Sequence, residues 1–265
     1  MSEGLAVVMD AAGTILRMYR VAKDIIRGIM LEKVITWELI MEKEGRALVV
    51  PQIDPTTVIS LPPEDHMASI IKGRERLVEI SCSSSPITKE DALKILYGSK
   101  VQVREMHEVY QAVKARCPDK YLTTGMIVDE DLQEITHVLS TGGSPFPGLR
   151  DVLHSLERQG ADIYVASGDS MHSLVNLKDY GFDPRRIYPV SSPRRKQEIV
   201  VALKRKYRRV VMVGDGLNDL YALLEADLGV LTVQQDTRPA LELREAADEV
   251  IMDIQELPEI VRSSI

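Results

Sequence analysis

The chain has 265 residues, enough for one large domain or two smaller ones with a sizeable core. Its net charge of −7 argues against a nucleic-acid partner or an anionic membrane surface. The only two cysteines, Cys82 and Cys117, exclude a disulfide framework and a zinc site, so a reducing, cytoplasmic compartment is expected. No targeting sequence is visible, and no apolar run approaches the roughly 18 residues of a membrane span. The composition does not indicate an oligomeric state.

The first predicted element is a buried strand, Leu5 to Met9, which ends on Asp10. Ala11-Ala12-Gly13-Thr14 follows and provides a tight connection. In an open α/β sheet, ligands bind outside the carboxyl ends of the strands, so Asp10 is a candidate functional carboxylate. A turn or capping role for Asp10 is the alternative.

The next 130 residues or so have a mixed pattern of their own. Apolar positions four apart, at Val21, Ile25 and Ile29, predict a helix over Tyr19 to Leu31. The run Val34 to Met41 fits either a helix or a strand, and Trp37 is expected in the core. Further predicted elements are strands at 47–50, 57–60, 76–82 and 121–128, and helices at 90–97 (N-capped by Thr88), 103–115 and 130–139.

A stretch rich in Gly, Ser and Pro, Thr141 to Gly148, reads as a linker into a helix over Leu149 to Gln159. The apolar run that follows predicts a strand from Asp162 to Ser167. Gly168 and Asp169 come directly after it, so the strand end has the sequence Ser-Gly-Asp. Asp169 or Ser170 is a candidate cap for a helix from Met171 to Tyr180.

A second helix start carries an unusual charge. Ser192 is a good N-cap and Pro193 a good first helical residue, but Arg194, Arg195 and Lys196 fill the first turn. Positive charge there opposes the helix dipole, at a cost of some tenths of a kcal/mol each, which indicates a nearby anion. Lys196 is the candidate to neutralise it, whereas a solvated surface position is favoured for the two arginines.

The segment from Val210 to Leu231 is the most informative. A strand-like run, Val210 to Val213, ends at Gly214-Asp215-Gly216, and Asn218 and Asp219 then open an amphipathic helix. Mg²⁺ prefers oxygen ligands, so the three oxygen side chains of Asp215, Asn218 and Asp219 at this strand end predict a magnesium site. Asn218 and Asp219 either support that site or cap the helix. Two more strands are predicted at 229–233 and 249–252.

These four motifs, in this order and each at a strand end, resemble the haloacid dehalogenase superfamily of phosphotransferases. From Phe146 to Asp253 the chain is similar to the phosphorylation domain of P-type ATPases, without the membrane segments of those pumps. The resemblance implies a doubly wound, mostly parallel α/β core formed by residues 1–16 and 145–265. Residues 17–144 would be an inserted α+β cap domain. Cap domains of this superfamily close over the active site.

The resemblance also implies roles for the residues. Asp10 would be the nucleophile that forms an aspartyl phosphate, and splitting the transfer in this way eases a difficult step. Ser167 and the amide of Gly168 would cradle the phosphate with Lys196, and the carbonyl of Ala12 would join Asp10 and Asp215 on Mg²⁺. Thr14, Asn218 and Asp219 would support the site, and the substrate would be a small phosphorylated metabolite or a nucleotide.

One position departs from the pattern. Most phosphatases of the superfamily carry a second Asp, the general acid and base, where this chain has Ala12. Because such a group contributes roughly 10² to 10⁴-fold, slow turnover is expected. Phosphonoacetaldehyde hydrolases carry Ala there, so a phosphonate carbon–phosphorus hydrolase using Lys33, Lys43 or Lys72 is an alternative. A catalytically weak phosphate- or nucleotide-binding regulator is another.

Overall fold

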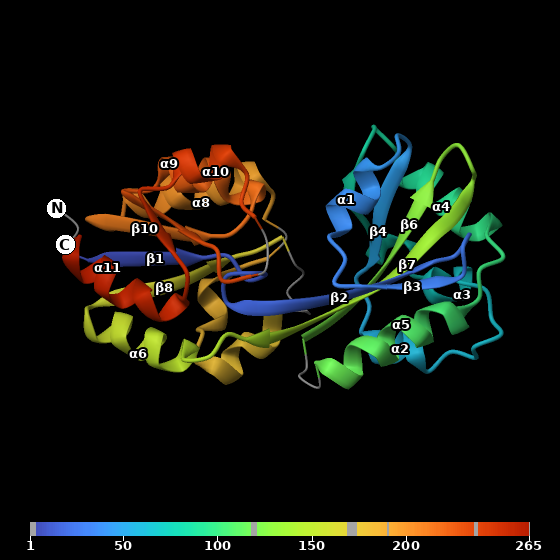
Figure 1. The fold of residues 1–265 in the computed structure, drawn as a ribbon, viewed down its shortest axis with the longest axis horizontal. Coiled ribbons are helices and arrows are strands. Elements are labelled where there is room, and N and C mark those ends of the chain that lie inside the picture. The colour runs from blue at the N-terminus through green and yellow to red at the C-terminus, as the bar shows by residue number, and fades with distance from the viewer. Residues whose placement is uncertain (1–3, 118–120, 169–173, 190, 236–237, 265) are drawn as a thin grey trace. The chain divides into compact units, whose positions relative to one another are not determined.

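The computed structural model describes residues 4–117, 121–168, 174–189, 191–235 and 238–264. The chain divides into two compact units. Unit 1 joins Met1–Met18 to Ser144–Ile265, and unit 2 is the intervening Tyr19–Gly143. In Figure 1 the blue first strand therefore lies among the orange and red elements of the chain's other end.

Unit 1 is built on a six-stranded sheet in which every neighbouring pair is parallel. The strand order is β12-β11-β10-β1-β8-β9, so the first strand of the chain is central. All five side chains of β1 are buried, which explains its continuous apolar sequence. The strands are β1 (Leu5–Met9), β8 (Ala161–Ala166), β9 (Ile187–Tyr188), β10 (Arg209–Gly214), β11 (Leu228–Thr232) and β12 (Glu249–Ile251).

Helices cover both faces of this sheet (Figure 1). One face carries α8 (Pro193–Lys204), α9 (Leu220–Glu225) and α10 (Leu241–Ala246), whose apolar side chains share a core with alternate residues of β1 and β10. The other face carries α6 (Leu149–Arg158) and α11 (Leu257–Ser263). The predicted doubly wound, mostly parallel α/β core is confirmed. Short 3₁₀ helices complete it: η2 (Val175–Tyr180), η3 (Pro184–Arg186), η4 (Leu217–Asp219) and η5 (Ile254–Glu256).

Unit 2 is an α+β domain with its own six-stranded sheet, in the order β3-β2-β7-β6-β4-β5. Side chains alternate between two clusters, with Met126 and Val128 in one and Ile127 in the other. The strands are β2 (Leu16–Asp24), β3 (Ile29–Glu32), β4 (Arg46–Pro51), β5 (Val78–Ser83), β6 (Tyr121–Asp129) and β7 (Glu134–Pro145). The helices are α1 (Thr36–Met41), α2 (Pro55–Ile59), α3 (Ala68–Ile71), α4 (Lys89–Gly98) and α5 (Val103–Arg116), with 3₁₀ helix η1 (Glu75–Leu77).

The helix predicted over Tyr19 to Leu31 is wrong, because this segment is the β2–β3 hairpin. Asp24 closes its turn: the carboxylate Oδ1 accepts from the amide of Arg27 at 2.9 Å, and the carbonyl accepts from the amide of Gly28 at 2.8 Å. The spacing of four placed Ile29 on the apolar face of the predicted helix, but in the structure this residue is 44% exposed.

Two further elements and the linker were also misassigned. The helix predicted at 130–139 is a turn followed by β7, and β7 continues through most of the predicted linker to Pro145. Ile135, Thr136 and Val138 are β-branched and favour a strand. The strand predicted at 57–60 is wrong, because residues 57–59 belong to helix α2 and Ser60 is its C-cap. The N-cap of α2, Asp54, accepts from the amide of Thr56 at 2.8 Å.

Of the other predictions, two agree with the structure and one is wrong. Thr88 is the N-cap of α4, and its side chain accepts from the amide of Asp91. The ambiguous run from Val34 contains helix α1. The prediction that Trp37 lies in the core is wrong, because this residue is 50% exposed. The predicted helix over Met171 to Tyr180 is described only in its second half, which is the 3₁₀ helix η2, and the candidate caps Asp169 and Ser170 lie outside the described residues.

Candidate active site

Three strand ends meet at one edge of the unit 1 sheet. In the parallel register, Met9 of β1 is opposite Val213 of β10 and Val165 of β8. The residues just beyond these ends therefore share the carboxyl edge, where open α/β sheets bind their ligands. Asp10, the first residue after β1, is 3% exposed, and its amide donates to the carbonyl of Val213 at 2.9 Å.

The loop after Asp10 is tightly folded. The amides of Ile15 and Leu16 both donate to the carbonyl of Ala11 at 2.9 Å, and the amide of Gly13 donates to the carbonyl of Leu16 at 2.8 Å. Gly13 has a φ of +77°, which L side chains rarely adopt, and a Cβ there would lie 1.8 Å from Oδ2 of Asp215. The absence of a side chain at Gly13 thus lets the Asp215 carboxylate lie against the loop backbone.

Lys196 connects two of the acidic residues. Ser192 caps α8 by accepting from the amide of Arg195 at 3.3 Å, and the fully buried Lys196 follows in the first turn. Its Nζ donates to Oδ1 of Asp10 at 2.7 Å and to Oδ1 of Asp219 at 2.6 Å. Burial alone would lower the pKa of Lys196, but these two carboxylates outweigh it and hold the pKa above its ordinary value. The two carboxylates therefore favour the protonated, positively charged form of Lys196.

The acidic residues form a cluster suited to a divalent cation. Asp10, Asp215 and Asp219 each offer a carboxylate oxygen, and these oxygens all lie within 4.8 Å of one another. Asp219 has other partners, since its Oδ2 accepts from the amides of Asp215 at 3.1 Å and Gly216 at 3.2 Å. An all-oxygen donor set fits Mg²⁺. Asp10 and Asp215 are then the candidate ligands, and Asp219 orients Lys196 and the loop.

Ser167 is held from its backbone. Its amide donates to the carbonyl of Tyr188 at 3.1 Å, its carbonyl accepts from the amide of Ser191 at 2.8 Å, and the residue is 2% exposed. The neighbouring Gly168 is exposed, and a Cβ there would find its nearest atom, the carbonyl oxygen of Ser191, at 4.0 Å. A ligand can therefore approach the backbone at Gly168.

The remaining predicted site residues differ in burial. Thr14 is fully buried, and its Oγ1 has no hydrogen-bond partner among the described residues. Ala12 is half-buried, and Asn218, on η4, is exposed. The structure thus groups Asp10, Lys196, Asp215 and Asp219 by direct contacts or proximity, while Asn218 lies at the surface of the same loop.

Sequence reasoning missed two glutamines behind this site. Gln234 donates from Nε2 to the carbonyl of Thr14 at 2.8 Å, and Gln235 accepts at Oε1 from the amide of Met18 at 2.9 Å. Both follow β11, more than 200 residues from their partners. The local sequence does not distinguish these two glutamines from a Gln-Gln pair on the surface that makes no such contacts.

The lysines considered for phosphonate chemistry lie in unit 2. A lysine that forms a Schiff base needs a lowered pKa. Lys43 has the opposite, because hydrogen bonding to the buried carboxylate of Asp129, at 2.7 Å, and to Asp131 raises its pKa. Lys33 and Lys72 are exposed.

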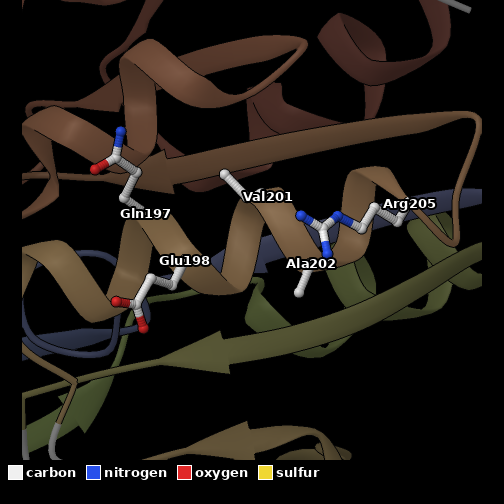
Figure 2. A pocket seen from close by; sticks show the side chains of 5 residues that line it. All are labelled: Gln197, Glu198, Val201, Ala202 and Arg205. Atoms are coloured by element: carbon white, nitrogen blue, oxygen red, sulfur yellow. The ribbon is translucent and has the colours of Figure 1, made fainter.

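A groove follows the outer side of α8 and is lined by Gln197, Glu198, Val201, Ala202 and Arg205 (Figure 2). Lys196 belongs to the same helix but does not line the groove, because its side chain is buried against Asp10 and Asp219. The groove is therefore separate from the acidic cluster.

Comparison with known proteins shows the family of the chain. A family model described as haloacid dehalogenase-like hydrolase matches residues 5–227. A relative from Methanocaldococcus jannaschii, described as a soluble P-type ATPase-like phosphatase, is 30% identical over 265 residues, which are 98% of this chain and 94% of the relative. This chain belongs to the haloacid dehalogenase-like hydrolases and is a hydrolase enzyme.

Ion pumps match over shorter stretches. The probable copper-importing P-type ATPase A of Enterococcus hirae is 32% identical over 82 residues, which are 31% of this chain and 11% of the pump. Among solved structures, a phospho-aspartyl intermediate analogue of phosphoserine phosphatase covers 98% of this chain and 99% of its own, at 15% identity and a TM-score of 0.46. Within the described part of the chain, none of the helices has the length and apolar character that crossing a membrane requires.

Proposed function

We propose that this hydrolase is a Mg²⁺-dependent phosphohydrolase that works through an aspartyl phosphate on Asp10. The observation that carries the proposal is the contact of buried Lys196 with both Asp10 and Asp219, beside Asp215. It places the amino group of Lys196 within hydrogen-bonding distance of the candidate nucleophile, Asp10. The relative from M. jannaschii, described as a soluble P-type ATPase-like phosphatase, supports the same reaction class.

In the proposed first step, a carboxylate oxygen of Asp10 forms a bond to phosphorus while the bond from phosphorus to the leaving oxygen breaks. Lys196 balances charge between the nucleophile and the phosphoryl oxygens. Ser167 and the amide of Gly168 would bind those oxygens, with Thr14 adjoining. Bound Mg²⁺, held by Asp10, Asp215 and the carbonyl of Ala12, would supply Lewis-acid stabilisation of the phosphoryl charge.

In the second step, a water oxygen forms a bond to phosphorus while the bond from phosphorus to the Asp10 carboxylate oxygen breaks, and the proton of that water passes to solvent or to the departing phosphate. Phosphate and the free Asp10 carboxylate result. This step benefits from a general base, and position 12 carries a methyl group instead of a carboxylate. We therefore infer that hydrolysis of the phosphoenzyme is slower than its formation. The substrate is a small phosphorylated metabolite or a nucleotide.

The test is to incubate the purified chain with Mg²⁺ and either p-nitrophenyl phosphate or radiolabelled ATP, and then to quench in acid. We expect an initial burst of product and acid-stable label that hydroxylamine removes, and neither should occur in Asp10→Asn. Wild-type protein with no turnover and no label contradicts the proposal. Binding of a phosphate analogue such as vanadate without any chemistry would instead indicate a regulator.

A further inference from the structure

Two adjacent glutamines after β11, which we call the glutamine clamp, hold the segment that follows the nucleophile. Gln234 donates from Nε2 to the carbonyl of Thr14 at 2.8 Å and accepts at Oε1 from the amide of Ile254 at 3.0 Å. One side-chain amide thus connects the end of the nucleophile loop to the start of η5. Thr14 is fully buried, so its carbonyl needs this partner.

Gln235 makes a similar pair of contacts with Met18. Its Oε1 accepts from the amide of Met18 at 2.9 Å, and its Nε2 donates to the carbonyl of Met18 at 3.2 Å. The side chain therefore satisfies both backbone groups of Met18, as a neighbouring strand would. Met18 is also the last residue of unit 1 before the chain enters unit 2.

The clamp consequently fixes both ends of a five-residue segment, Thr14 to Met18. A third contact lies between them, since the amide of Phe146 donates to the carbonyl of Ile15 at 3.1 Å. On its other side, the loop is held by its bonds to the carbonyl of Ala11 and by the position of Asp10 against Lys196. Any slip of this segment would move the loop that carries the nucleophile.

We propose that Gln234 and Gln235 are positioning residues for phosphoryl transfer, which keep the Asp10 loop in register by clamping the segment behind it. The inference rests on the proposed function. Each clamp residue donates one hydrogen bond and accepts another. A glutamine side chain can do both, whereas an ionised glutamate of the same length can only accept. The identity of the residues, rather than their size alone, is therefore what the mechanism needs.

The test replaces the donor while keeping the shape. Gln234→Glu can still accept from the amide of Ile254 but cannot donate to the carbonyl of Thr14 when it is ionised. Since small misplacements remote from the chemistry cost up to roughly 100-fold, we expect kcat to fall roughly 10- to 100-fold with little change in KM for p-nitrophenyl phosphate. Gln235→Glu should act in the same direction.

Gln159→Glu is the matched control. Gln159 also lies in unit 1, and its Nε2 donates to the carbonyl of Pro258 at 2.9 Å, away from the nucleophile loop. It loses the same kind of hydrogen bond and should keep wild-type kcat. Circular dichroism and thermal unfolding of all three variants establish that they are folded.

A pH series gives a readout that general destabilisation would not produce. The introduced carboxyl, half-buried beside a carbonyl oxygen, has its pKa raised above the ordinary value of about 4.3, and once protonated it can donate again. The ratio of Gln234→Glu kcat to wild-type kcat should therefore rise as the pH falls from about 8 to about 5. A flat ratio, or equal kcat losses in Gln234→Glu and Gln159→Glu, overturns the clamp. Wild-type protein without turnover or Asp10 label overturns the proposed function and, with it, the clamp's role in it.

Discussion

Gly13 is the residue at which backbone conformation and the site are most closely connected. In Gly13→Ala the new Cβ would lie 1.8 Å from Oδ2 of Asp215, so that carboxylate has to move. We expect phosphatase activity to fall at least tenfold, at an unfolding free-energy cost of about 1 kcal/mol from the positive φ. Activity assays and urea denaturation measure the two effects.

Gly160→Ala is the control for that experiment. Gly160 has a φ of +81°, close to that of Gly13, but nothing lies within 4 Å of a Cβ there. It should lose similar stability and keep its activity. Equal activity in the two variants would show that the contact with Asp215 has no bearing on the reaction.

Lys196→Met should be destabilised as well as inactive. It leaves the carboxylates of Asp10 and Asp219 buried without their cation, which costs about 3–5 kcal/mol. The variant has more uncompensated negative charge at the site. Added Mg²⁺ should therefore raise the unfolding free energy of the variant by more than it raises that of wild type. Denaturant unfolding with and without Mg²⁺ checks this, and an equal Mg²⁺ effect in both proteins contradicts it.

The pH dependence of that stability gap follows from the raised pKa of Lys196. A raised folded-state pKa means that the stabilisation is fully present below the unfolded value of about 10.4 and is lost only as pH rises through the folded value. The difference between wild type and Lys196→Met should therefore stay constant from about pH 8 to about pH 9, and it should shrink at lower pH because the unpaired, buried carboxylates of the variant take up protons. Unfolding curves across that range measure it.

Ala12→Asp tests the missing general acid and base. If position 12 limits hydrolysis of the phosphoenzyme, the variant should turn over faster by up to roughly 10² to 10⁴-fold and accumulate less label. Steady-state rates and acid-quenched labelling are the measurements. Unchanged turnover with unchanged label would mean that another group already supplies the proton transfer.

At the level of single elements, the caps were the most predictable features. Ser192 and Thr88 are hydroxyl side chains next to their helices, and both cap in the structure as the sequence indicated. The hairpin from Leu16 to Glu32 was not predictable from spacing, because apolar residues four apart fit either period over so short a run. Asp24 and Gly28 are the turn residues between the strands, and both residue types favour turns. They indicated the hairpin, whereas the apolar spacing suggested a helix.

The candidate site also combines features that the local sequence predicts with features that depend on tertiary contacts. Asp10 and Asp215 were predictable because each directly follows an apolar strand, and parallel strands bring their ends to one edge. Lys196 was predicted to face Asp10, but its second hydrogen bond, to Asp219, depends on the tertiary position of α8, which local sequence does not encode. The glutamine clamp depends on contacts more than 200 residues apart.

For the element α8, the cap of Ser192 should matter beyond the helix itself. Ser192→Ala and Thr88→Ala each remove one capping hydroxyl, so each should lose about 1 kcal/mol of unfolding free energy. Only Ser192→Ala loosens the turn that carries Lys196, so only it should also lower kcat. Denaturant unfolding and steady-state kinetics of the pair provide the comparison, and equal kcat values would contradict the link.

At the scale of the whole molecule, unit 2 should be separable. Residues 19–143 are one continuous stretch with their own apolar cluster, and the strands that hold the two ends, β2 and β7, are neighbours in the sheet. We expect a fragment of these residues to fold and unfold cooperatively. Thermal unfolding followed by circular dichroism tests this, and a non-cooperative or unfolded fragment contradicts it.

The central place of β1 has a consequence for biosynthesis. Its two neighbours, β8 and β10, are made roughly 150 and 200 residues later, whereas unit 2 is complete by residue 143. On the ribosome, the inserted unit can therefore fold while the nascent first strand, wholly apolar, still lacks both partners. Until β8 and β10 emerge, β1 remains an apolar segment without its neighbouring strands, which is the kind of transiently exposed segment that favours aggregation.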